Sequence, residues 1–339
     1  MAKFSRRFFN AAALVSVPAL FRNPVEALPE VGKVISDPEI LSFYTKLLKD
    51  LKDGKLDYSF KDTFDPVAAA HSKTLSFPEG TEEREKAKYS AGEMDKKYLE
   101  AGGDWRDDNF DDVPGDKRDY ICKNRITYRD ALFLIDRSKV VLFGEIHTVA
   151  DHQEMELRLL GDMEGHSLCY ACEDFGIDMA GRIEGFLGGK CSNTFLDSLD
   201  KEAVRKLEAA KKLDVPVVVT DLSRRQKEDI TPGYRRFSDP KRSAIRERVF
   251  ARQILYAAKK GYRAFGTFGD AHVQSDAIPK HLKAYGIEAL VITTSSMSPE
   301  VYHAAMDISG GDNIFFRRNG AIVYASKDLG SRCERYKKK

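Results

Sequence analysis

Across residues 120–295, the apolar positions follow two patterns, one typical of buried strands and the other of amphipathic helices. Short apolar runs without alternation, such as 140–143, indicate strands covered on both faces. Between such runs, apolar residues recur every three or four positions, as in 201–213 and 243–260, which predicts helices. This alternation of strand and helix predicts an α/β fold, a mostly parallel sheet with helices on both faces.

The same periods and their boundary residues predict the remaining elements of this region. Helices are expected at 127–135, 152–160 and 278–285, and strands at 167–172, 215–220, 289–293 and from 262 onward. Residues 314–324 form two strand-like runs around Asn319-Gly320, which predicts a C-terminal β-hairpin with a type I′ turn. Residues 181–200, rich in glycine and serine, are expected to form a connection or a lid.

The first residues have the layout of a signal peptide over residues 1–27. Arg6-Arg7 precede an apolar segment at 11–21, and small residues at 25–27 offer a cleavage site. The segment is too short for a comfortable membrane span, and the paired arginines resemble a twin-arginine export signal. We therefore expect export to the periplasm or another extracytoplasmic space. The alternative is an apolar helix that stays on the chain as a membrane tether.

Residues 28–119 predict a helical N-terminal extension that ends in an acidic loop. Asp37-Pro38-Glu39 is typical of a helix start, with an N-cap and a proline at the first position, and apolar residues recur at helical spacing over 40–51. A charged helix is expected from Thr81 to Gly102, followed by the acidic loop at 104–116. The predicted domains are thus the leader 1–27, the extension 28–119 and the α/β domain 120–339.

Charge and cysteine content narrow the classes of partner. Lysine plus arginine total 55 against 53 aspartates and glutamates, so no overall field favours nucleic acid, and we expect no integral membrane span in the mature chain. Five cysteines is an odd number. Cys169 and Cys172 lie three apart inside a predicted strand and should point to opposite faces, which favours buried free thiols over a disulfide or a shared metal.

The sequence Gly-x-x-His closes two of the predicted strands. Gly144-Glu145-Ile146-His147 ends the first, and Gly269-Asp270-Ala271-His272 ends the other, in a chain with seven histidines. Parallel strands present their carboxyl ends at one rim of a sheet, where ligands of α/β proteins collect. We therefore expect both motifs to meet there, together with Glu173 and Asp221, which also follow predicted strands. The alternative is that both histidines are structural groups at strand ends, and that Asp221 caps the next turn.

Two imidazoles and one carboxylate are a standard ligand set for a divalent transition metal such as Mn, Co, Zn or Fe. His147, Glu173 and His272 are the candidate ligands, with Glu145 as the acid/base and Arg246, from the helix 243–260, as an oxyanion or carboxylate partner. Without a metal, a histidine paired with a carboxylate can act as a general base. His152 is a further candidate ligand.

The chain resembles a known superfamily over residues 120–295. The residues that carry the resemblance are 126–132, 141–147, Glu173, 246–254 and 269–272. They are similar to the ChaN-like branch of the superfamily that includes Tiki, TraB and erythromycin esterase. The resemblance implies an α/β core and a site of Glu145, His147, Glu173, Arg246 and His272. The ChaN pattern commonly continues its first histidine with Asp-Asn, whereas this chain has Thr148-Val149.

The resemblance implies two functions from different classes, because the superfamily contains metal-dependent proteases and esterases whereas the ChaN branch is associated with haem binding. The first expectation is a metal-assisted hydrolase of an ester or amide bond in a small-molecule or peptide substrate. The alternative is a haem- or iron-binding protein without turnover, in which His147 or His272 binds the cofactor. A homodimer is left open.

Overall fold

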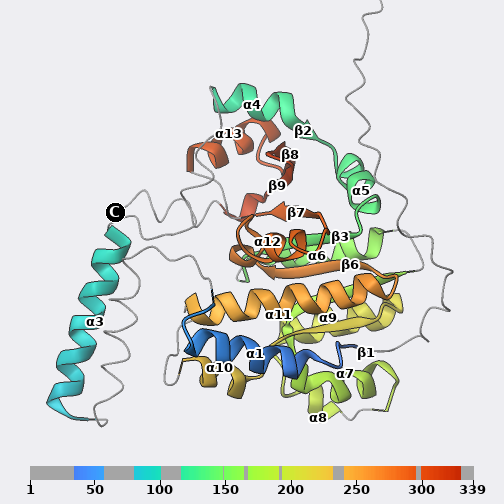
Figure 1. Ribbon diagram of the computed structural model, residues 1–339. Coiled ribbons are helices and arrows are strands. Elements are labelled where there is room, and N and C mark those ends of the chain that lie inside the picture. The colour runs from blue at the N-terminus through green and yellow to red at the C-terminus, as the bar shows by residue number, and fades with distance from the viewer. Residues whose placement is uncertain are drawn as a thin grey trace, which may run out of the picture.

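The structure, a computed structural model, describes residues 34–56, 80–100, 116–147, 149–163, 167–190, 193–231, 240–294 and 299–329. It has the α/β fold that the sequence predicts, built on one nine-stranded sheet with the order β1-β5-β4-β6-β3-β7-β9-β8-β2 (Figure 1). The strands are β1 (Val34–Ile35), β2 (Arg125–Ile126), β3 (Val140–Glu145), β4 (Leu168–Gly176), β5 (Val217–Asp221), β6 (Arg263–Gly269), β7 (Ala289–Thr293), β8 (Ile314–Arg318) and β9 (Ala321–Ala325).

The first seven strands of this order, β1 through β9, pair in parallel. The sheet then ends in two antiparallel pairings, of β9 with β8 and of β8 with β2. Asn319 and Gly320 between β8 and β9 both have positive φ values, 47° and 84°, as a type I′ turn requires. The predicted C-terminal hairpin is confirmed.

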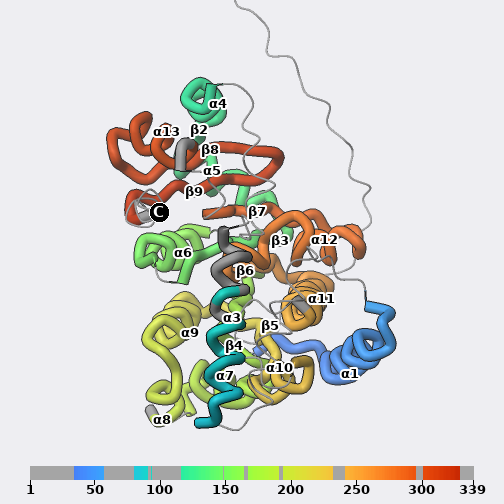
Figure 2. Tube along the Cα trace, turned by 90° about the vertical axis from the view of Figure 1, so that its left-hand side faces the viewer, coloured from blue at the N-terminus to red at the C-terminus, as the bar shows by residue number. Residues whose placement is uncertain are grey.

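Helices cover both faces of the sheet, as Figure 2 shows with α6 and α9 on one side of the strands and α11 and α12 on the other. The described helices are α1 (Ile40–Lys52), α3 (Glu82–Glu100), α4 (Lys117–Asn124), α5 (Tyr128–Asp136), α6 (Ala150–Asp162), α7 (Ala180–Leu187), α8 (Asn193–Leu196), α9 (Lys201–Leu213), α10 (Arg224–Ile230), α11 (Pro240–Lys259), α12 (Ile278–Lys283) and α13 (Pro299–Ser309). Short 3₁₀ turns span Ile177–Met179, Asp270–Val273 and Lys327–Leu329.

Strand β3 shows why its apolar run has no alternation. Val141 and Phe143 pack into a core with α5, α6 and α9, whereas Val140 and Leu142 pack into a second core with α11 and α12. Because successive side chains of a strand point to opposite faces, a strand between two helical layers needs apolar residues at every position. This burial on both faces positions β3, and with it the carboxyl end of the strand, at the centre of the sheet.

The two strand cysteines follow the same rule. Cys169 lies in the core beneath α11 and Cys172 in the core beneath α9. Both are buried and free, so the expectation of ordinary buried thiols is confirmed for this pair.

Residues 34–56 pack directly on the sheet domain. Strand β1, which the sequence analysis did not predict, pairs with β5, and α1 packs against α10 and α11. Helix α1 begins at Ile40 with Glu39 as its N-cap, so the predicted cap at Asp37 is wrong by two residues. Asp37 instead accepts a hydrogen bond from the Glu39 backbone N–H at 2.9 Å and one from Arg252 at 2.6 Å, which ties this segment to α11.

The segment 181–200 differs from the expected connection or lid. Its described part contains helices α7 and α8, and Ile183 and Phe195 enter the core beneath α9. Glycine and serine lowered the helical signal there, but burial of apolar residues decides the structure. The predicted leader and most of the acidic loop lie outside the described residues.

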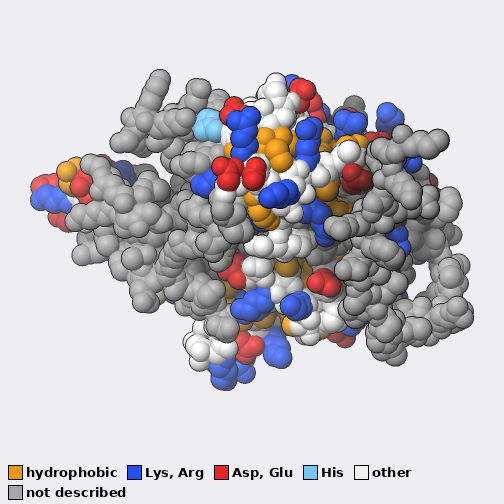
Figure 3. Space-filling model, turned by 90° about the horizontal axis from the view of Figure 1, so that it is seen from above, with side chains coloured by type: hydrophobic (Ala, Val, Ile, Leu, Met, Phe, Trp, Pro, Cys, Tyr) orange, Lys and Arg blue, Asp and Glu red, His pale blue; other side chains and the backbone are white. Residues whose placement is uncertain are grey.

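None of the helices that the structure describes is both long and apolar enough for a membrane span. The face seen in Figure 3 carries basic and acidic side chains side by side among its described residues.

Candidate functional site

The order of four central strands brings the predicted site residues to one rim of the sheet. Strand β4 lies between β5 and β6, and β6 lies between β4 and β3. All four run parallel, so their carboxyl ends meet at the same edge. Glu173 of β4 therefore lies between Asp221 of β5 and the two Gly-x-x-His motifs that close β6 and β3.

A change of register in β4 accompanies the position of Glu173. Cys172 is paired with Val219 of β5, but the next pairing joins Gly176 to Asp221, so β4 carries two extra residues over this stretch. Such a bulge re-aims side chains near a strand end. The Glu173 side chain is 9% exposed and accepts a hydrogen bond from the Gly269 backbone N–H at 3.0 Å. The carboxylate is thereby held across β6.

The glycines of the two motifs serve close packing. A Cβ on Gly269 would lie 3.3 Å from Nε2 of His147 and 3.6 Å from Oε1 of Glu173. A Cβ on Gly144 would lie 2.3 Å from Oδ1 of Asp270, a clash. Gly144 lies outside the positive-φ residues, so it is needed because the second motif crosses directly over the first.

His147 lies between two carboxylates. Its Nε2 is 2.8 Å from Oε1 of Glu173, and its Nδ1 is 3.3 Å from Oε1 of Glu145. The imidazole is 49% exposed, whereas the Glu145 side chain is fully buried. Hydrogen bonds to Glu145 and Glu173 raise the pKa of His147 from 6.5 to about 11. His147 is therefore an imidazolium at neutral pH, with both ring N–H groups engaged.

The two carboxylates respond in the opposite direction. Burial alone would raise the pKa of Glu145, but the hydrogen bond from His147 and the charge of Lys206 outweigh it and lower that pKa to about 2. Burial would likewise raise the pKa of Glu173, yet the hydrogen bond from His147 and the positive charges around it hold that pKa far below its usual range. Both carboxylates are ionised at neutral pH.

His272 approaches Glu173 from the other side. Its Nε2 lies 3.9 Å from Oε2 of Glu173 and 3.4 Å from Nη1 of Arg246, while its Nδ1 is 3.2 Å from Oε1 of Glu247. Arginine can only donate, so these contacts assign the ring proton to Nδ1, and the Nε2 lone pair accepts the hydrogen bond from Arg246 at the rim. Glu247 thus orients His272 as a carboxylate orients a metal-binding or catalytic histidine.

Asp221 anchors the guanidinium of Arg246. Nε and Nη2 of Arg246 donate to the two oxygens of Asp221 at 2.9 and 3.0 Å, a bidentate pair, and Lys227 also bonds this carboxylate. Coulombic attraction to Asp221 and Glu173 outweighs burial and raises the pKa of Arg246. On α11, Arg246 reaches the rim, while Arg248 donates to the Ala244 carbonyl and Arg252 pairs with Asp37.

We call His147, Glu173, His272, Arg246, Glu247 and Asp221 the rim cluster. On the other side of His147 lies a second group, the lysine cage, in which Lys206 contacts Glu145, Glu156, Asp174 and Glu202. Glu145 belongs to the cage and also contacts His147, so the two groups meet at this imidazole. Ligand atoms of Glu145, His147 and Glu202 lie within 4.8 Å of one another, the spacing of a metal site.

Helix α6 holds the turn that carries His147. Nδ1 of His152 accepts a hydrogen bond from the Ile146 backbone N–H at 3.2 Å, and Gln153 donates to the His147 carbonyl at 2.8 Å. His152 is fully buried and its ring lies 5.8 Å from that of Tyr324. Its position therefore supports the turn, and the structure does not bring it to the rim cluster as the additional ligand considered above.

The structure brings together all five residues predicted for the site: Glu145, His147, Glu173, Arg246 and His272. Their catalytic roles stay predictions. Sequence reasoning missed Glu247 and Lys206. Glu247 had a signal, because it follows Arg246 directly on a helix expected at the rim. Lys206 had none, since a lysine in an amphipathic helix is ordinarily solvated.

No family model matches the chain, and no curated protein matches it. Among solved structures, one similarity is to ChaN of Campylobacter jejuni, described by its cofacial heme binding, with 14% identity, a TM-score of 0.41, and coverage of 50% of this chain and 86% of that one. Another is to the C-terminal region of Pasteurella multocida toxin, described as having a thiol-protease-like catalytic triad, with 16% identity, a TM-score of 0.37, and coverage of 68% and 30%. A third is to RRSP, a MARTX toxin effector domain from Vibrio vulnificus, with 15% identity, a TM-score of 0.31, and coverage of 81% and 66%. These are low-identity likenesses of chain arrangement.

Proposed function

We propose that this protein is a hydrolase that cleaves an ester or amide bond in a small-molecule or peptide substrate at the rim cluster, with the help of one divalent transition metal. The observation that supports it most is that two Gly-x-x-His motifs, more than a hundred residues apart in the chain, meet the two oxygens of one buried carboxylate. His147 contacts Oε1 of Glu173 and His272 faces Oε2. A structural role for either histidine would not require a shared partner.

The donor set around Glu173 suits a transition metal. Imidazole nitrogens with a carboxylate bind Mn, Co, Zn or Fe, and Nε2 of His272, whose ring Glu247 orients through Nδ1, carries no proton and would exchange its hydrogen bond from Arg246 for the metal. His147 would give up the Nε2 proton that it now shares with Glu173. His147, Glu173 and His272 would thus hold the ion, which when bound lowers the pKa of a coordinated water and polarises a carbonyl.

The chain's own residues supply the rest of the chemistry. Glu145 remains ionised beside His147 and can take or return a proton at its buried Oε2, which has no hydrogen-bond partner among the described residues. Arg246 keeps its charge within 3.4 Å of His272, where it favours negative charge that develops on a carbonyl oxygen. Asp221 holds Arg246 in that place through two hydrogen bonds.

Three measurements on the purified full-length protein test this function. We expect about one equivalent of Mn, Co, Zn or Fe by elemental analysis, no Soret band in the absorption spectrum, and hydrolysis of p-nitrophenyl acetate or labelled casein that a chelator abolishes and the metal restores. A Soret band that survives washing, without hydrolysis, would instead support the alternative of a haem-binding protein. Absence of both metal and turnover would contradict the proposal.

We also propose that residues 1–27 direct export through a twin-arginine signal. The support is the sequence alone, since Arg6 and Arg7 lie outside the described residues. Replacing Arg6 and Arg7 together by lysine should hold the full-length protein in the cytoplasm while the folded domain stays intact. Cell fractionation and the size of the mature chain measure this, and export and trimming of the double variant as before would refute it.

A further inference from the structure

Lys206 is a buried ammonium group in contact with four carboxyl groups. It lies on α9, its side chain is 1% exposed, and its Nζ is 2.8 Å from Oε1 of Glu145. Oδ2 of Asp174 lies at 2.9 Å, Oε1 of Glu202 at 3.0 Å and Oε2 of Glu156 at 3.6 Å from the same nitrogen. Lysine is almost never fully buried unless it is paired, so these contacts are what hold it there.

The position of Nζ is one that a metal ion could take. Three carboxylate oxygens from three different elements surround a single point at 2.8 to 3.0 Å, and carboxylate oxygens suit a hard cation such as Ca²⁺, whose coordination shell of about six to eight oxygens water would complete. Oε2 of Glu145 is also buried without a hydrogen-bond partner among the residues that the structure describes. This carboxylate therefore has an oxygen that Lys206 does not engage.

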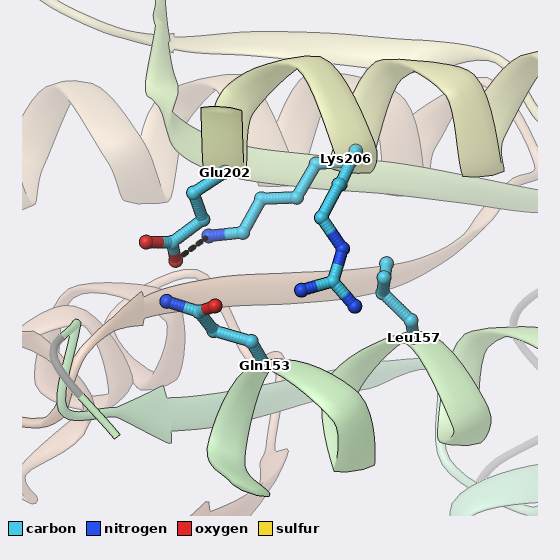
Figure 4. A pocket seen from close by; sticks show the side chains of 5 residues that line it. Gln153, Leu157, Glu202 and Lys206 are labelled. Carbon is cyan, nitrogen blue, oxygen red and sulfur yellow. Dashed lines mark ion pairs between the residues drawn. The ribbon is translucent and has the colours of Figure 1, made fainter. Parts of the chain in front are cut away.

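The lysine cage shares Glu145 and Glu202 with the group of three residues, completed by His147, whose ligand atoms have the spacing of a metal site. Glu145 and Glu202, two of the three residues whose ligand atoms gather within 4.8 Å, are the same carboxylates that bind the lysine ammonium. Two cations sharing these oxygens would repel each other in a poorly hydrated place. Figure 4 shows Lys206 and Glu202 side by side on α9, joined by their ion pair, with Gln153 and Leu157 approaching from α6.

We propose that the Lys206 ammonium is the resident cation of the lysine cage and that it closes a latent oxygen-ligand metal site between Glu145, Asp174 and Glu202. This assignment stands whether or not the protein hydrolyses a substrate. A consequence that does rest on the proposed function is that the rim cluster binds a single metal ion, on the Glu173 side of His147, because the second position is filled by the lysine. The site would be mononuclear.

Replacing Lys206 with methionine tests the cage directly. Methionine keeps most of the aliphatic stem and removes the ammonium. Asp174 and Glu202 side chains are each 21% exposed, so ions can reach the cage from solvent. Calcium is the probe, because it prefers carboxylate oxygens over imidazoles and so distinguishes the cage from the rim cluster. Lys212→Met, an exposed lysine of the same helix, is the matched control.

In full-length protein, isothermal titration should show one Ca²⁺ bound by Lys206→Met and none by the wild type or by Lys212→Met. At about a hundredfold excess over Kd, calcium should raise the melting temperature of Lys206→Met by about 5 °C and leave the other two unchanged. The double variant Lys206→Met with Glu202→Gln should lose most of this gain. Equal calcium binding by wild type and Lys206→Met, or a folded Lys206→Met that binds none, would overturn the proposal.

Lys206→Met can fail to fold without a cation, and Lys206→Gln, which keeps hydrogen-bond donors for the carboxylates, provides a second variant. Refolding of either one in the presence of calcium but not in its absence supports the proposal. If calcium rescues neither, the cage is not a cation site and the proposal fails. The metal content of the wild-type rim, measured separately with Mn²⁺ or Zn²⁺, tests the proposed function, so the two failures are distinguishable.

Discussion

The lysine cage and the rim cluster, on the two sides of the His147 imidazole, neutralise buried carboxylates with different cations. Both place buried carboxylates in a poorly hydrated region where each needs a positive partner. The lysine cage has a permanent, covalently attached cation, and its carboxylates have their partner before any ligand arrives. On the rim side, Glu173 is balanced by the His147 imidazolium and by Arg246, which Asp221 already pairs, while Nε2 of His272 lies nearby. A histidine can lose a proton and bind a metal ion in its place, whereas the buried, paired lysine keeps its proton. We therefore expect metal binding at the rim cluster and not in the lysine cage.

Substitution of Glu173 should have the largest effect on this contrast. Glu173→Gln keeps the side-chain volume but removes the charge that both histidines share, so kcat/KM should fall by about 10²- to 10⁴-fold. The amide oxygen can still accept the Gly269 N–H bond, so the variant should remain folded. Hydrolysis of p-nitrophenyl acetate measures the effect, with the exposed Glu208→Gln as control. Activity within about threefold of wild type would mean that the rim is not the reaction site.

On the other side, the main effect of losing the cation should be on stability. In the absence of calcium, Lys206→Met leaves the cage carboxylates without their partner and should cost about 3–5 kcal/mol of unfolding free energy. Urea unfolding measures it, and Lys212→Met should stay within about 0.5 kcal/mol of wild type. A loss no greater than that of the control would show that the ammonium is unimportant to the fold.

A smaller effect is expected at Glu247, which contacts the rim through His272. Glu247→Gln removes the carboxylate that fixes the Nδ1–H tautomer, and metal affinity should fall about 10- to 100-fold. Competition with a chelator of known affinity gives the change. Glu247→Asp, which restores the charge, should recover part of it. Equal metal affinities in wild type, Glu247→Gln and Glu247→Asp would show that Glu247 does not orient His272 for metal binding.

The pH dependence of stability sharpens the comparison further. Glu145 has its pKa lowered from 4.5 to about 2, so its contribution is present above 4.5 and is lost as pH falls toward 2. His147 has its pKa raised from 6.5 to about 11, so its contribution is present below 6.5 and is lost as pH rises toward 11. The stability that His147 confers should therefore be greatest between pH 4.5 and 6.5. Urea unfolding of wild type and His147→Ala from about pH 3 to about pH 9 measures it, and a difference that stays constant below pH 4.5 and above pH 6.5 would refute the pairing.

Much of the fold was predictable because local signals agreed with the tertiary structure. The helix at Lys201–Leu213 was predicted with the bounds that the structure has, the helix expected at 127–135 spans Tyr128–Asp136 with Thr127 as its N-cap, and the Asn319-Gly320 hairpin follows from a short motif. Strand β1 could not be predicted, because two residues carry no period. Its pairing with β5 is decided by contacts remote in sequence.

The site also contains residues that could be predicted from the sequence and residues that could not. Residues at the carboxyl ends of the strands, such as Glu145 of β3 and Glu173 of β4, follow from topology, because parallel strands end at one rim. The bulge in β4 and the contacts of Lys206 depend on several elements at once and leave no local pattern. The need for glycine at position 144 likewise comes from the tertiary structure, because Asp270 crosses close to it.

The central claim is that His147 and His272 serve one site through Glu173, and a double-mutant comparison of bound metal and haem tests it most directly. His147→Ala and His272→Ala should each lose the bound metal, the double variant should be scarcely worse than either, and stability should fall by about 1 kcal/mol per substitution. If instead each variant keeps its full ligand content while the losses in melting temperature add, the two histidines are independent structural groups and the claim is wrong.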